Sequence, residues 1–151
     1  MIIPAGQAGQ AGRAGEAGQA GRAAKSLPAH LERVVLKLTK ARASGKIGDE
    51  FDPLIDRVNA ELEVARASAA GLRGEARRAL IARLAGLDEE LLQGARATLS
   101  ENDLSTLARE AADELGSFRD RMTPDAFARA RDSAVSRLIR ERFGLPTMTW
   151  A

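Results

Sequence analysis

Few side chains in this sequence can perform chemistry, and their spacing matches none of the common catalytic motifs. A hydrolytic triad needs a Ser or Cys nucleophile, an imidazole base and a residue that orients the base. His30 is the only histidine, the chain has no cysteine, and no Gly-x-Ser-x-Gly motif occurs. We therefore predict a protein that is not an enzyme and has no catalytic residue.

Metal, cofactor and phosphate sites find no better support. Zinc sites use Cys and His at fixed spacings, and di-iron helical bundles use Glu-x-x-His twice; the chain contains neither pattern. The adjacent acids at 89–90 and 113–114 point in different directions on a helix, which predicts solvated surface. The segment 45–48 contains a lysine between glycines but lacks the order of a phosphate-binding loop. We expect no metal, no cofactor and no small-molecule substrate.

Basic side chains are concentrated near the N-terminus. The formal net charge is +2, yet residues 1–46 hold eight Lys or Arg against two acids, and residues 47–151 hold fifteen against nineteen. A row of cations on one helix face can neutralise nucleic-acid phosphates, or it can be a solvated face opposite the core. No aromatic residues are interleaved for base stacking. The candidate nucleic-acid contacts are Arg22, Lys25, Arg33, Lys37 and Lys40.

Arginines also occur within an apolar arc of the last expected helix, at residues 124–143. On a helical wheel, Arg131 and Arg142 fall among Phe127, Val135 and Leu138. A buried arginine must pair or extend its head group to solvent. Either acids of the preceding helix (Glu110, Asp113, Glu114) pair with these arginines, or the arc docks an acidic partner segment. Trp150, the only tryptophan, either packs back on the helices or anchors another chain. The candidate docking residues are Phe127, Arg131, Leu138, Arg142 and Trp150.

The elements that must position these residues are helices. Alanine is abundant and β-branched residues are sparse, which favours helix over strand. Apolar residues recur at helical spacing in five segments: 28–44, 52–70, 75–99, 100–122 and 124–143. The most regular stripe is Leu104, Leu107, Ala108, Ala111, Leu115, Phe118 and Met122. Because the loops are short, we predict an all-α antiparallel bundle of about five helices, with sequential helices packed side by side.

Helix ends are marked by recognisable residues. The expected N-caps are Ser26, Asp52, Ser100 and Thr123, with proline following two of them, and the expected helix-ending glycines are Gly45 and Gly144. Within 75–99, Gly86 and Asp88 permit a restart, so we expect a kink or break near residue 88.

Residues 1–26 form an Ala/Gly-rich low-complexity segment that predicts a disordered tail, because it lacks apolar side chains to offset its ordering entropy. The helical domain is expected over 27–146, with a short C-terminal tail at 147–151.

No apolar run approaches the ~20 residues of a membrane span, and no signal peptide is recognisable, which predicts a cytoplasmic protein. These features favour a helical protein–protein interaction or assembly module whose partner is another protein or a second copy. Nucleic-acid binding is the alternative.

Overall fold

The computed structural model describes residues 26–68 and 72–150, and every regular element in these ranges is helical. They are α2 (Leu27–Ala43), η1 (Asp49–Phe51), α3 (Asp52–Ala67), α4 (Gly74–Ala97), α5 (Glu101–Glu114), η2 (Gly116–Arg121) and α6 (Pro124–Phe143), where η denotes a 3₁₀ helix. The all-α class is confirmed. Apart from Ser26, the predicted tail lies outside the described residues, and so do Arg22 and Lys25.

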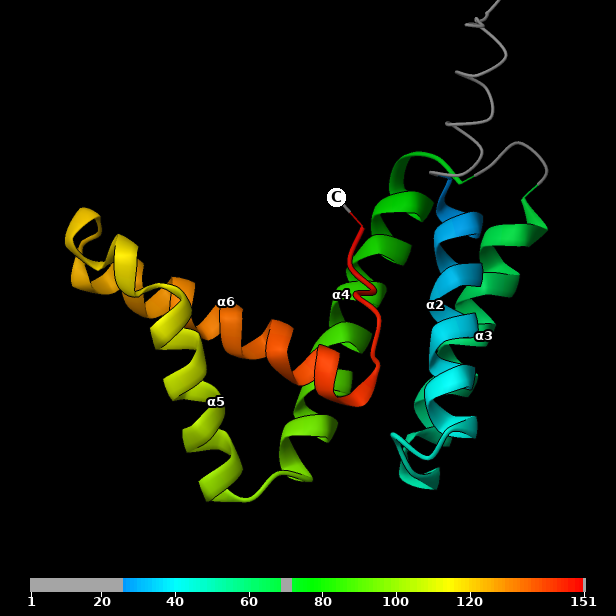
Figure 1. Ribbon diagram of the computed structural model, residues 1–151. Coiled ribbons are helices and arrows are strands. Elements are labelled where there is room, and N and C mark those ends of the chain that lie inside the picture. The colour runs from blue at the N-terminus through cyan, green and yellow to red at the C-terminus, as the bar shows by residue number, and fades with distance from the viewer. Residues whose placement is uncertain (1–25, 69–71, 151) are drawn as a thin grey trace, which may run out of the picture.

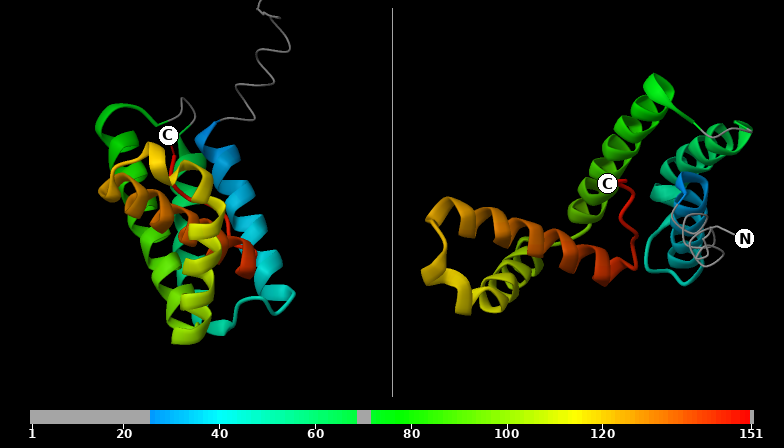
Figure 2. Two further views of the ribbon diagram at one scale, coloured as in Figure 1. Left: turned by 60° about the vertical axis from the view of Figure 1, so that its left-hand side comes forward. Right: turned by 90° about the horizontal axis from the view of Figure 1, so that it is seen from above.

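The helices are arranged as two antiparallel hairpins joined through α4 (Figures 1 and 2). α2 packs along α3, and α5 packs along α6, while α4 contacts both α3 and α6. α6 crosses α4 steeply, and α4 and α5 diverge from their short connection (Figure 1). Antiparallel packing of sequential helices therefore holds within each hairpin, and the α5–α6 hairpin extends away from α2 and α3.

Local capping chemistry sets most helix starts. The Ser26 side chain accepts a hydrogen bond from the Ala29 N–H at 3.3 Å, Ser100 accepts from Asp103 N–H at 3.1 Å, and the Thr123 hydroxyl does the same for Ala126 at 3.1 Å. α6 ends at Gly144, whose φ of 66° is in the left-handed region that glycine adopts without strain. These expectations are confirmed.

The expected N-cap of α3 is wrong. Asp52 is the first helical residue, and Phe51 occupies the cap position without a side-chain hydrogen bond. The Asp52 carboxylate instead accepts hydrogen bonds from Arg42 at 2.9 and 3.4 Å. An ion pair between α3 and α2 thus takes the place of the local capping interaction. At its other end, α3 stops at Ala67, before the predicted residue 70.

We expected a kink or break near residue 88, and the break is wrong, because α4 is continuous from Gly74 to Ala97. Leu84, Leu87 and Leu91 are all buried, and their packing holds the helix together across Gly86. Asp88 is buried on the same side, so its role is in the interior and not at a helix start.

α5 is shorter than its apolar stripe predicts. The α-helix ends at Glu114, and η2 takes the chain from Gly116 to Arg121. Of the seven stripe residues, Leu107 and Ala111 are buried, whereas Phe118 is 45% exposed. After the change of helix type at residue 114, Leu115 and Met122 remain partly buried, and Phe118 is the stripe residue that becomes exposed.

The core is one cluster of buried side chains. Most of them come from α2, α3 and α4, and the others include residues of α5, α6 and the C-terminal segment. Its largest fully buried side chains are Leu31, Leu38, Leu80, Leu84, Leu91, Ile139, Met148, Val34 and Val58. Met148 belongs to this set although it follows the last helix, so the C-terminal residues are part of the folded core.

Candidate interaction surfaces

The C-terminal strap, residues 145–150, runs between α2 and α4 (Figures 1 and 2). Leu145 and Met148 are buried, with 2% and 0% exposure, while Thr147 and Thr149 face solvent. The strap thus fills the space between two helices that pack mainly on other neighbours.

A buried carboxylate anchors the strap. Arg140 donates to both carboxylate oxygens of Asp88, at 2.9 and 2.6 Å, and the Met148 N–H donates to Asp88 Oδ1 at 3.0 Å. Arg140 Nη1 also donates to the Pro146 carbonyl at 2.8 Å. The two charged side chains are only 10% and 14% exposed. Each charge therefore has the partners that burial requires.

Sequence reasoning missed both anchor residues. It read Asp88 as a helix restart and did not select Arg140 as a candidate residue. The available signal was an acid between Leu84 and Leu91 on an otherwise apolar stripe, which indicates a buried, paired charge.

The strap ends on α2, against His30. His30 Nε2 lies 3.1 Å from the Met148 carbonyl oxygen, and the His30 and Trp150 ring centroids are 5.1 Å apart with planes tilted by 53°. The Arg77 guanidinium carbon lies 6.0 Å from the Trp150 ring centroid. His30 thus has a packing role, and Trp150 is half-buried on this chain's own helices.

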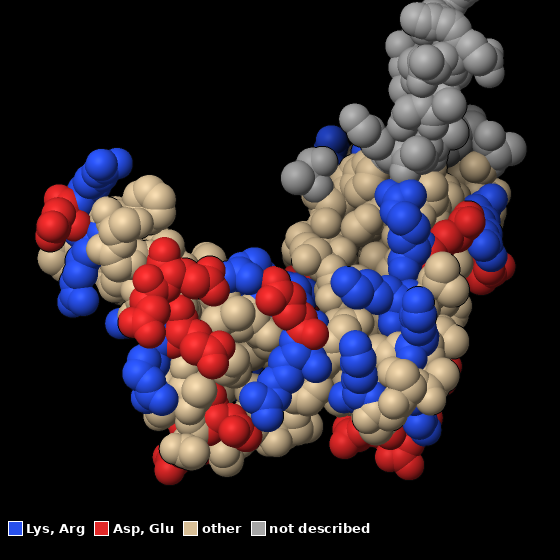
Figure 3. All heavy atoms as spheres, viewed as in Figure 1, with Lys and Arg blue, Asp and Glu red and all other residues tan. Residues whose placement is uncertain are grey.

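The cationic residues predicted on the first helix come together on α2 as the basic stripe, Arg33, Lys37 and Lys40. All three are exposed, and none forms an ion pair within residues 26–68 and 72–150. Lys37 and Lys40 line a hollow of about 300 Å³ together with Lys46 and Gly144. Figure 3 shows basic side chains gathered over α2.

Four of the five acidic residues of α5 define a second charged surface, the acidic stripe: Asp103, Glu110, Asp113 and Glu114. Two of them pair with α6: Glu114 accepts from Arg137, and Asp103 lies 3.7 Å from Arg142. The hydrogen bonds from Arg137 to Glu114 and Glu141 raise the pKa of Arg137. Figure 3 shows the acidic side chains over α5, on the same face as the basic stripe.

The predicted docking residues do not form one patch. Phe127 is buried beneath the Arg119 guanidinium, 5.0 Å from the ring centroid. Leu138 is half-buried against the core, and Arg142 pairs with Asp103 as described. Arg131 is half-buried. These four residues lie along α6, while Trp150 lies on α2.

Large apolar side chains are exposed at three places in the described chain: Leu36 at 68%, Phe118 at 45% and Val64 at 43%. Phe118 lies in η2, at the end of the α5–α6 hairpin, where Leu115 and Met122 are half-buried. Sequence reasoning placed Phe118 in the core stripe and so did not identify it as a surface residue.

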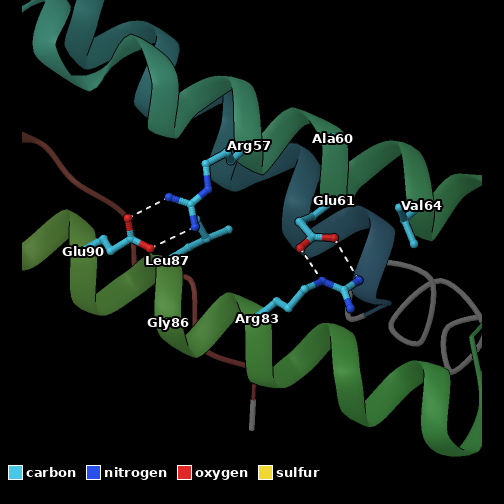
Figure 4. A pocket seen from close by; sticks show the side chains of 8 residues that line it. All are labelled: Arg57, Ala60, Glu61, Val64, Arg83, Gly86, Leu87 and Glu90. Carbon is cyan, nitrogen blue, oxygen red and sulfur yellow. Dashed lines mark hydrogen bonds and ion pairs between the residues drawn. The ribbon is translucent and has the colours of Figure 1, made fainter.

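A groove of about 430 Å³ lies between α3 and α4. Figure 4 shows two arginines reaching across it, Arg57 to Glu90 at 2.6 and 2.9 Å, and Arg83 to Glu61 at 2.6 and 3.0 Å. These hydrogen bonds raise the pKa of both arginines and lower the pKa of Glu90. Because each carboxylate has a guanidinium partner, the groove presents interhelical ion pairs and no acid poised for proton transfer.

No protein-family model, no curated protein and no solved structure matches this chain. Within the described ranges, no three His, Asp or Glu side chains gather in a way that would hold a metal ion. None of the helices α2 to α6 combines the length and the hydropathy that crossing a membrane requires.

Proposed function

We propose that this protein is a non-enzymatic protein–protein interaction or assembly module. The observation that supports this function best is the incomplete covering of the α5–α6 hairpin. Its apolar stripe has the length of a bundle-core stripe, yet only Leu107 and Ala111 are buried, and Phe118 is almost half exposed. The hairpin extends away from α2 and α3 (Figure 1), so no other helix among residues 26–68 and 72–150 covers its far end.

The far end of the hairpin has the chemistry of a docking site. Phe118, Leu115 and Met122 are apolar and partly exposed, and Arg119 lies beside them over Phe127. Aromatic residues, Met and Arg are enriched in protein interfaces, and aromatic anchors contribute most of the binding energy. The partner proposed here is an apolar helix face that would cover the rest of the stripe.

Capture of partners from lysate with two matched variants tests the function. Phe118→Ser removes the proposed anchor, whereas Val64→Ser removes a side chain of nearly equal exposure on α3. After nuclease treatment of the lysate, we expect wild type and Val64→Ser to capture the same partner. Phe118→Ser should not capture it. Equal capture by both variants would contradict the proposal. Cell fractionation tests the compartment, which we propose to be the cytoplasm.

Nucleic-acid binding is a second candidate, and one observation favours it. The strap brings Trp150 next to His30 on α2, three residues before Arg33. An aromatic ring therefore lies at the end of the basic stripe, where base stacking could accompany phosphate contacts. Sequence reasoning found no such aromatic residue.

Titration of single-stranded DNA against the Trp150 fluorescence tests this second function. Binding should weaken steeply as salt rises, because each neutralised phosphate releases a counterion. Lys37→Glu and Lys40→Glu should each reduce the affinity. No binding at low salt, or equal affinity at low and high salt, would exclude the nucleic-acid function.

A further inference from the structure

The acidic stripe and the basic stripe fit each other as two halves of one interface. We infer that a second copy of this chain binds to the face that carries both, as a two-fold dimer in which the acidic stripe of each copy lies on the basic stripe of the other. This inference goes beyond the proposed function, because it uses a surface other than the end of the α5–α6 hairpin and does not depend on Phe118.

Only some of the charged residues of the two stripes form ion pairs within one copy of the chain. Elsewhere the chain pairs acids and bases between helices, as in Arg57–Glu90 and Arg83–Glu61. By contrast, none of the basic-stripe residues has an ion-pair partner among the described residues, and neither do Glu110 and Asp113 of the acidic stripe. Each stripe therefore keeps charge that an opposite surface can neutralise.

The basic stripe is the shorter of the two and fits within the length of the acidic stripe. Arg33 to Lys40 spans about 10 Å along α2, and Asp103 to Glu114 spans about 16 Å along α5, at about 1.5 Å per helical residue. Basic and acidic side chains alike project from regular helices, so two such rows can lie against each other along most of their length. Leu36, 68% exposed, follows Arg33 by three residues and precedes Lys40 by four, which adds an apolar group to the basic surface.

Their placement on the molecule gives the symmetry. Figure 3 shows acidic side chains over α5 on one side of the face and basic side chains over α2 on the other, and Figure 1, drawn from the same side, shows the C-terminal part of α6 and the strap between these two helices. A two-fold axis in the plane of this face, directed along α2, turns a second copy over and exchanges the two sides. α5 of each copy then faces α2 of the other, so the same contact forms twice in a closed dimer.

Contacts between opposite charges steer association and fix register, and they weaken when salt screens them. Sedimentation velocity of the full chain should therefore show a dimer at micromolar concentration in about 0.1 M salt, and a shift toward monomer in about 1 M salt. A wild type that is monomeric at low salt overturns the inference. Association that nuclease treatment abolishes also overturns it, and identifies nucleic acid as the ligand of the basic stripe.

Charge exchange between the stripes is the decisive experiment. One variant carries Lys37→Glu with Lys40→Glu, and the other carries Glu110→Lys with Asp113→Lys. Each places like charges opposite one another, so each should dimerise at least tenfold more weakly than wild type. Mixed in equal amounts, the two variants should form a heterodimer, because every contact again joins opposite charges.

The matched control is Asp49→Lys with Asp56→Lys, which changes the net charge as much as the acidic-stripe variant, at exposed positions of η1 and α3. It should dimerise like wild type, and circular dichroism should show unchanged helicity in all three variants. Two reversed variants that still dimerise alone, or that form no heterodimer when mixed, overturn the inference. Loss of the heterodimer with continued partner capture through Phe118 would leave the proposed function standing.

Discussion

The pair of Asp88 and Arg140 shows how one buried charge can fix the course of a chain segment. Burying a carboxylate is costly unless it is paired and hydrogen-bonded. Here the carboxylate receives three hydrogen bonds, two from Arg140 and one from the strap backbone. Because the strap N–H is one of the donors, the position of the strap and the neutralisation of Asp88 depend on each other.

Removing Arg140 should therefore destabilise the folded protein strongly. Arg140→Leu leaves a buried carboxylate without its counter-ion and should lower the free energy of unfolding by about 3–5 kcal/mol, measured by urea denaturation. Arg137→Leu is the control: Arg137 also pairs with acids, but its side chain is about half exposed, so its loss should have little effect. Similar stabilities of the two variants would show that the Asp88 pair contributes no more than a surface ion pair.

Acid should weaken the α3–α4 contact through Glu90. The hydrogen bonds from Arg57 lower the pKa of Glu90 in the folded state, so the ionised carboxylate favours folding. This contribution is complete above the unfolded-state pKa of about 4.3 and is lost as the pH falls through the lower folded-state value. Urea denaturation between neutral and acidic pH should show a smaller loss of stability for Glu90→Gln than for wild type. Glu89→Gln, next to it and without an arginine partner among the described residues, should follow wild type.

Periodicity could indicate that Asp88 is buried, but it could not have predicted which residue pairs with it. Arg140 lies 52 residues further along the chain, and helical spacing shows which residues share a face but not which distant helix covers it. The basic stripe, in contrast, depends on local spacing alone, and its three residues do lie together as expected.

At the scale of elements, three of the four N-caps predicted from local chemistry were confirmed, the exception being Asp52, which pairs with Arg42 instead. The caps Ser26, Ser100 and Thr123 involve atoms three residues apart, so the sequence alone defines them. Gly86, inside α4, weakens the helix by about 1 kcal/mol relative to alanine, and the burial of Leu84 and Leu87 is large enough to offset that. Composition cannot report this tertiary contribution.

Two glycines of α4 should respond differently to alanine. A Cβ at Gly86 would meet no neighbouring atom within 4 Å, whereas a Cβ at Gly94 would lie 3.2 Å from the buried Phe51 ring. Gly86→Ala should therefore raise the free energy of unfolding by close to the full helix-propensity gain, about 1 kcal/mol. Gly94→Ala should raise the free energy of unfolding by less, because the Phe51 ring must move to make room for the new Cβ. Thermal or urea unfolding compares the pair, and a larger gain at Gly94 would contradict the packing described for Phe51.

At the scale of the whole molecule, the strap joins parts that otherwise contact each other little. α2 packs mainly on α3, while α4 contacts α3 and α6, and the strap lies between α2 and α4 with Met148 in the common core. The sequence left open whether Trp150 packs back on the helices or anchors another chain, because a six-residue segment has too little pattern to reveal which surface it covers. An interior that spans all these elements should unfold as one cooperative unit.

Trp150 provides the measurement, because it is the only tryptophan and the chain has no tyrosine. Its fluorescence reports the strap, whereas circular dichroism reports the helices, and in wild type the two signals should change at the same urea concentration. Met148→Ala, which empties a fully buried site, should lower the free energy of unfolding by about 2–5 kcal/mol and move both transitions together. Thr147→Ala changes an exposed neighbour in the same strap and should leave both unchanged. If the Trp150 signal is lost at lower urea than the helical signal, the strap detaches independently and does not couple the helices.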